Sequence, residues 1–215
     1  MMISVLPTQI KKFRSFGWVQ DPSNLISLCN VVAVFDSNSQ THKDLIDRNI
    51  SKLVEKRDGR DTFINTLKQN PLKIPYSQLV GTSFTPRSSS RCNGIIQVTV
   101  KGQGRDFIGD WPADNFVRWA HCFGFIKYNY NDDTFEITNE GLALSAARNN
   151  PVELSESEKA LLIDAALAYS PAIRILKLLS ATEDTHLTKF EIGKQLGFIG
   201  EDGFTSMPQK ILIQA

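Results

Sequence analysis

The sequence predicts a mainly α fold with small β wings, and two observations carry this prediction. Apolar residues recur at helical spacing in several stretches, of which residues 24–36 and 112–126 are the clearest. Directly afterwards, residues 124–130 and 134–138 alternate between apolar and polar side chains around Asn131-Asp132-Asp133, which is typical of a β-hairpin. We therefore expect a helix that leads straight into one small hairpin.

The length of the chain favours two units. Its 215 residues, 41% of them hydrophobic, can bury one good core or two small ones. We predict a first subdomain over residues 1–150 and the opening of a second over residues 151–215. The longest apolar run, Ala160 to Ala168, contains Asp164 and is shorter than the roughly 20 residues that span a bilayer. The first residues also lack the basic-then-apolar order of a signal peptide, so we expect a soluble cytoplasmic protein.

The first subdomain is expected to open with two helices. Residues 24–36 place Leu28 and Val32 on one helical face, and Ser23 is a possible cap. Residues 42–57 are rich in charge and predict an exposed helix.

Residues 74–141 predict a series of elements whose order matches a known motif. Residues 74–82 predict a short helix with Pro75 near its start and Gly81 at its end. Residues 92–100 fit either a helix or a strand, and the amphipathic helix and the hairpin follow, with the hairpin closing at Gly141. Helix, turn, helix or strand, helix and hairpin is the order of a winged helix-turn-helix. A generic α+β core remains the alternative.

The second subdomain begins with a capping signal. Ser155 is followed three residues later by Glu158, which predicts a capping box, and Pro171 predicts a break or restart of the helix near Ser170. Residues 187–198 resemble the first helix of another helix-turn-helix, whose partner helix would begin only at residues 205–208. We therefore expect this subdomain to be truncated and the chain to be the front part of a longer protein.

Charge is unevenly distributed along the chain. Residues 1–110 contain 15 Lys and Arg against 9 Asp and Glu, whereas residues 111–215 contain 9 against 14. A polyanion is therefore expected to bind the first half. Chance asymmetry between solvated faces is the alternative.

Metal-binding and catalytic patterns are missing from the sequence. Three cysteines and three histidines lie without metal-ligand spacing, and buried free thiols are expected for Cys29, Cys92 and Cys122. Common magnesium-dependent nucleases combine clustered carboxylates with a lysine. No lysine here has an acidic residue two positions before it, so we expect neither a catalytic residue nor a metal ligand.

Several stretches resemble the amino-terminal DNA-recognition region of FokI-like type IIS restriction endonucleases. They occur in the family's order over most of residues 13–213, and they are "RSFGWVQDP" (14–22), "LVGTSFTPRS" (79–88), "IIQVTV" (95–100), "RWAHCFGFIKY" (118–128), "SPAIRILKLL" (170–179), "HLTKFEIGKQLGF" (186–198) and "GFTSMP" (203–208). The resemblance implies sequence-specific binding of duplex DNA at a short asymmetric site by a monomer. In the family a separate domain cuts the DNA with Mg²⁺, and the resemblance places that domain outside these residues.

The resemblance also implies which side chains read bases. They are Gln20, Asp21, Arg87, Gln103 and Trp111. Arg87 could bind guanine O6 and N7, and each glutamine could bind adenine N6 and N7. Trp111 could press against a thymine methyl group, or it could belong to the core. Exposed surface side chains are the alternative for Arg87 and the two glutamines.

One of these positions departs from the family. The family carries asparagine at the position of Asp21, and a carboxylate suits a cytosine amino group instead, so the resemblance does not fix the target sequence. Sequence-independent phosphate contacts are expected from Lys11, Lys12, Arg14, Arg91, Lys101 and Arg105.

Two other functions compete with this reading. A winged-helix transcription regulator would usually dimerise on a two-fold symmetric site. A winged-helix protein-interaction module would bind its partner without the steep salt dependence of phosphate contacts.

Overall fold

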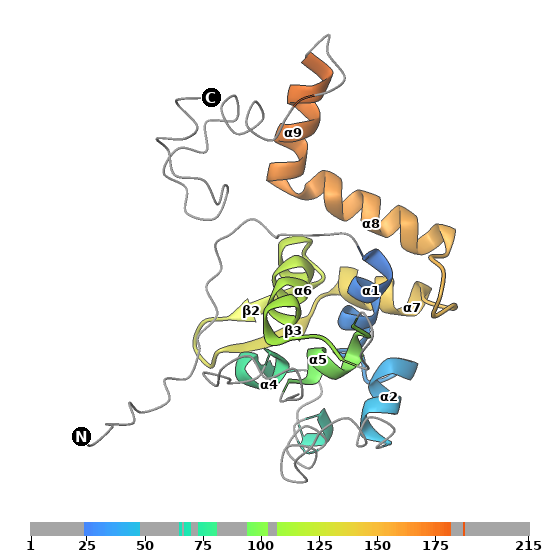
Figure 1. The fold of residues 1–215 in the computed structure, drawn as a ribbon, viewed down its shortest axis with the longest axis vertical. Coiled ribbons are helices and arrows are strands. Elements are labelled where there is room, and N and C mark those ends of the chain that lie inside the picture. Colours follow the sequence, from blue (N-terminus) through green and yellow to red (C-terminus); the bar gives the residue numbers. More distant parts are fainter. Residues whose placement is uncertain are drawn as a thin grey trace, which may run out of the picture.

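A computed structural model describes residues 24–47, 65, 67–69, 73–80, 94–102, 107–181 and 187. Within these ranges the chain is mainly helical, with one small antiparallel sheet, as the sequence predicts (Figure 1). The elements are α1 (Leu25–Ala33), α2 (Gln40–Ile46), β1 (Ile74–Pro75), α4 (Tyr76–Val80), α5 (Ile95–Thr99), α6 (Asp110–Cys122), β2 (Ile126–Asn129), β3 (Thr134–Ile137), α7 (Asn139–Ala147), α8 (Glu156–Ala168) and α9 (Ser170–Ala181).

Helix α1 lies at the centre of the core and packs against α2, α5, α6 and α7. Its side chains Leu28, Val31 and Val32 are completely buried, as is Phe35 just beyond its end. Burying each such side chain stabilises the fold by about 1.5–3 kcal/mol. The cap is Asn24 rather than the expected Ser23, because the Asn24 side chain accepts a hydrogen bond from the Ser27 amide at 2.9 Å.

The sheet has the order β1-β3-β2, so the central strand pairs with both neighbours. The hairpin pairs Ile126 with Ile137 and Asn129 with Thr134, which confirms the two predicted strands. On the other side of β3, Ile74 pairs with Phe135 in a two-residue strand that the sequence analysis placed in a helix. The sequence did not predict this strand because its partner lies about 60 residues away. Local periodicity cannot reveal a pairing between residues so far apart in the chain.

Residues 95–99 form a helix, which decides between helix and strand for that stretch. Its β-branched residues weakly favour a strand, but Ile95 and Ile96 are fully buried and α5 packs against α1, α4 and α6. Tertiary packing therefore outweighs local propensity here.

Helix α7 was not predicted, and Gly141 lies within it rather than closing the hairpin. Thr138 caps this helix by accepting a hydrogen bond from the Gly141 amide at 3.1 Å. A Cβ atom at Gly141 would lie 2.1 Å from the Phe125 carbonyl oxygen, so only glycine allows the helix to approach the start of the hairpin so closely.

The expected capping box at the start of α8 is confirmed. The Ser155 hydroxyl accepts from the Glu158 amide at 3.1 Å, and the Glu158 carboxylate accepts from the Ser155 amide at 2.8 Å. The expected break is also present, since α8 ends at Ala168 and α9 begins at Ser170. Figure 1 shows α8 along one side of the first unit and α9 standing away from it.

Within the described ranges, no helix combines the length and the apolar character that a bilayer crossing requires.

Candidate nucleic-acid interface

The amino-terminal turn of α6 presents an aromatic side chain to solvent. Gly109 precedes the helix in an extended conformation, and Trp111 in the first turn is 50% exposed. This exposure excludes the core alternative for Trp111. The opposite face of the helix carries the buried residues Ala113 and Val117, which fix its orientation against the core.

A buried polar network locks α6 to α4. The Tyr76 hydroxyl donates to Asp114 Oδ1 at 2.6 Å, and Arg118 Nε donates to Asp114 Oδ2 at 2.9 Å. Burial, and next the Asp114 carboxylate, raise the pKa of Tyr76 well above its ordinary value. The tyrosine therefore stays a hydrogen-bond donor at neutral pH, and the carboxylate that it contacts is also paired with a guanidinium group.

The other end of α6 contacts the junction between α8 and α9. The rings of Phe123 and Tyr169 meet edge to face with centroids 5.7 Å apart. Burial raises the pKa of Tyr169 and the pKa of Cys122. Tyr169 lies outside the predicted first subdomain, residues 1–150, and yet it contacts the carboxyl-terminal end of α6.

The tip of the hairpin is acidic. Residues 126–137 contain one lysine against three carboxylates. Lys127 pairs with Glu136 at 2.8 Å, and Lys73 lies 3.9 Å from Asp132. Burial, and next a hydrogen bond to Asp133, raise the pKa of Tyr128 to about 12. Such a surface is poorly suited to phosphate groups, since few cations there are left without a carboxylate partner.

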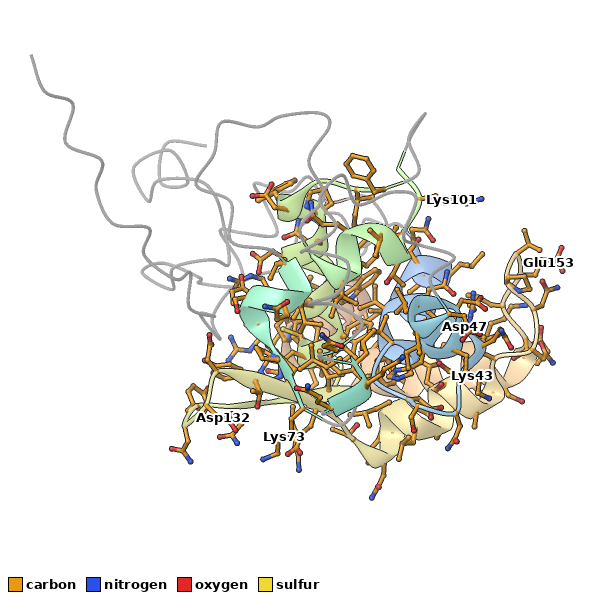
Figure 2. The ribbon with its side chains drawn as sticks, turned by 90° about the horizontal axis from the view of Figure 1, so that it is seen from below. Lys43, Asp47, Lys73, Lys101, Asp132 and Glu153 are labelled. Atoms are coloured by element: carbon orange, nitrogen blue, oxygen red, sulfur yellow. The ribbon has the colours of Figure 1, made fainter. Side chains whose placement is uncertain are left out.

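Of the residues expected to contact DNA, the structure describes Trp111 and Lys101. Lys101 is exposed, and Figure 2 shows it at the opposite end of the molecule from Lys73 and Asp132. The others lie outside the described residues, and they are Gln20, Asp21, Arg87, Gln103, Lys11, Lys12, Arg14, Arg91 and Arg105. The expectation that Arg87 and Gln103 contact bases therefore stays a prediction.

The network that holds α6 was not predicted from the sequence. Asp114 and Arg118 are four residues apart on one helix, so their pairing could have been found from sequence. The contact with Tyr76, 38 residues before Asp114, leaves no local signal.

Among the residues that the structure describes, no group of three or more His, Cys, Asp or Glu side chains is arranged to hold a metal ion. Cys29 is a buried free thiol, as expected, whereas Cys122 is free but only partly buried. Cys92 lies outside the described residues.

Comparison with known sequences gives concordant matches. A family model described as FokI, recognition domain, subdomain 1 matches residues 14–147. The type II restriction enzyme FokI of Planomicrobium okeanokoites is 44% identical over 206 residues, which cover 95% of this chain and 34% of that enzyme. The type II restriction enzyme StsI of Streptococcus sanguinis is 32% identical over 201 residues, which cover 93% of this chain and 32% of that enzyme. The chain thus spans about a third of the length of these curated relatives.

Solved structures agree with the sequence matches. The structure of restriction endonuclease FokI superimposes with a TM-score of 0.77 at 43% identity, over 94% of this chain and 34% of the other. FokI bound to DNA superimposes with a TM-score of 0.79 at 43% identity, over 95% of this chain and 35% of the other. Because the family model covers well over half of the 215 residues, the chain belongs to the family of the FokI recognition domain, subdomain 1.

Proposed function

We propose that this chain recognises a short asymmetric sequence in duplex DNA, as the specificity-determining part of a type II restriction endonuclease. The observation that carries the proposal is the match to FokI, with 44% sequence identity and a TM-score of 0.79 to the DNA-bound enzyme. Cleavage belongs in this proposal to a separate nuclease domain that uses Mg²⁺. No step of the cleavage reaction is assigned to the described residues.

The proposed reading unit is a winged helix-turn-helix in which α6 enters the major groove. The topology supports it, since the helices α4, α5 and α6 lie between β1 and β2 in the sequence and the sheet has the order β1-β3-β2. In helix-turn-helix proteins the first turns of the recognition helix contact base edges. The exposed Trp111 occupies that place on α6, where its ring can contact a thymine methyl group.

The remaining base contacts are proposed for Gln20, Asp21, Arg87 and Gln103. Arg87 is assigned to a guanine, which contributes about 1–3 kcal/mol of discrimination. Phosphate contacts from Lys101 and the basic residues of the first half would add salt-dependent affinity. The acidic hairpin tip favours a geometry in which the hairpin braces α6 and leaves the phosphates to other surfaces.

Selection from a pool of random duplexes tests the proposal. We expect the full 215-residue chain to enrich an asymmetric site as a 1:1 complex, with affinity falling steeply as salt rises from about 50 to 200 mM. Enrichment of a two-fold symmetric site by a dimer would support the transcription regulator instead. Absence of salt-dependent DNA binding, together with capture of a protein, would support the interaction module.

Removal of divalent metal provides a second check. Binding should require no divalent metal and should persist in EDTA, because the proposed contacts use only protein side chains. Incubation of the purified chain with its selected duplex and Mg²⁺ should leave the strands uncut on a denaturing gel. Cutting that co-purifies with the chain would contradict the assignment of cleavage to a separate domain.

A further inference from the structure

The outward face of α6 carries a second side chain suited to reading a base. Asn115 lies four residues after Trp111, so the two side chains share one face of the helix. At about 1.5 Å per residue, Asn115 lies roughly 6 Å further along the helix axis. Asn115 is partly exposed, whereas its neighbour Asp114 is buried.

The amide of Asn115 is uncommitted in the described part of the chain. Its side chain makes no hydrogen bond there, in contrast to Asp114 and Arg118, which bind each other. Asparagine is also a weak helix former because its side chain competes for backbone hydrogen bonds. An unpaired amide in the second turn of α6 therefore contributes little to folding.

The surroundings of Asn115 favour a neutral polar ligand over a phosphate. The Asp114 carboxylate is bound by both Tyr76 and Arg118, so this charge is compensated within the protein. Arg118 is held in that ion pair with a side chain that is 18% exposed. The amide group of Asn115 offers one donor and one acceptor in a fork, which matches adenine N6 and N7.

We propose that Asn115 is a further specificity-determining residue, which reads an adenine in the major groove within about two base pairs of the base contacted by Trp111. The spacing follows from the roughly 6 Å between the two residues and the 3.4 Å rise per base pair. This inference rests on the proposed function, since it requires α6 to lie in the groove.

The test compares the full chain with Asn115→Ala and Asn115→Asp. After the parent's site has been selected, affinities are measured for duplexes that carry each of the four base pairs at each position. The parent should prefer adenine at one position by about 10- to 100-fold, and Asn115→Ala should abolish the preference there alone. Asn115→Asp keeps only acceptors, so it should shift the preference at that position to cytosine, whose amino group is a donor.

Asn131→Ala is the matched control. Asn131 is an exposed asparagine in the hairpin turn, and its replacement should leave every preference unchanged. Thermal unfolding of all variants verifies that they are folded, and the cytosine shift of Asn115→Asp is a gain that misfolding cannot imitate.

The other outcomes are distinguishable. If Asn115→Ala keeps every preference of the parent, or binds all duplexes more weakly by one common factor, Asn115 does not read a base. In either case the parent still selects a site and the proposed function stands. A parent that selects no site would instead overturn both the proposed function and this inference.

Discussion

Helices α1 and α9 are both rich in apolar residues, yet they use them in opposite ways. Six of the nine residues of α1 are buried, whereas Pro171 is the one buried residue among the twelve of α9. Leu176 and Leu179 of α9 are 50% and 37% exposed. Apolar composition therefore does not decide burial; the neighbours that the fold supplies do.

Helix α8 is intermediate between α1 and α9, because it buries residues in its first half and exposes apolar residues in its second half. Glu158 and Leu162 in its first half are buried, while Ile163 and Leu167 are 58% and 50% exposed. The buried half is held by a polar contact, because Arg148 pairs with Glu158 at 2.9 Å. The first unit thus builds its own core and binds the start of α8 as its outermost layer.

A matched pair of truncations tests the comparison most directly. Leu28→Ala should lower the free energy of unfolding by about 4 kcal/mol, because it leaves a cavity in the core. Leu176→Ala should change it by less than about 0.5 kcal/mol, because this side chain is half exposed. Urea unfolding followed by circular dichroism measures both. Equal losses would mean that α9 contributes to the same core as α1.

Removing the ion pair at the start of α8 should have the next largest effect. Glu158 is completely buried and the Arg148 side chain is 9% exposed, so Glu158→Ala leaves a buried charge without its partner and should cost about 3 kcal/mol. A double-mutant cycle with Arg148→Ala separates the pairing from the loss of the capping box. Glu156→Ala, which removes the exposed pair with Lys159, is the control and should leave stability unchanged.

The network beneath α6 should contribute less. Tyr76→Phe removes one donor to the buried Asp114 carboxylate and should cost about 2 kcal/mol. Tyr130→Phe, which alters a side chain that is 73% exposed, should cost nothing measurable. A Tyr76→Phe protein as stable as the parent would show that Arg118 alone compensates the carboxylate.

The smallest effect concerns alkaline pH. Burial, and next the Glu158 carboxylate, raise the pKa of Cys29 from 9.0 to about 12. The protonated thiol is favoured in the folded state, so this contribution to stability is complete below pH 9 and is lost as pH rises towards 12. Between pH 8 and pH 10 the parent should lose about 1 kcal/mol more than Cys29→Ala. Parallel pH profiles for the two proteins would contradict the shift.

Local signals predicted much of this architecture. The hairpin, α6, the capping box at Ser155 and the break at Ser170 each follow from residues that are neighbours in the sequence. What escaped prediction depends on distant partners. The strand at Ile74 exists because Phe135 pairs with it. Helix α7 can pack closely against the hairpin because Gly141 has no Cβ atom that would clash with the Phe125 carbonyl oxygen.

The candidate interface was likewise predicted only in part from the sequence. The predicted helix began at residue 112, just after Trp111, whereas α6 begins at Asp110 and includes it. The exposure of Trp111 could be read only from the fold, which decided against the core. Asn115 was overlooked because a single asparagine in an amphipathic helix carries no pattern of its own. The structure distinguishes it from the neighbouring Asp114, whose carboxylate is bound by Arg118 and by Tyr76 from another element.

The contact of Tyr169 with the end of α6 has a mechanical consequence. Helix α6 has 13 residues and is therefore about 20 Å long, with Tyr169 bearing on one tip and Trp111 projecting from the other. Asp114 in the first half of the helix is also bound to Tyr76, so α6 is anchored near both ends. A substitution at Tyr169 should therefore loosen the carboxyl-terminal end of α6, while the turn that carries Trp111 stays in place.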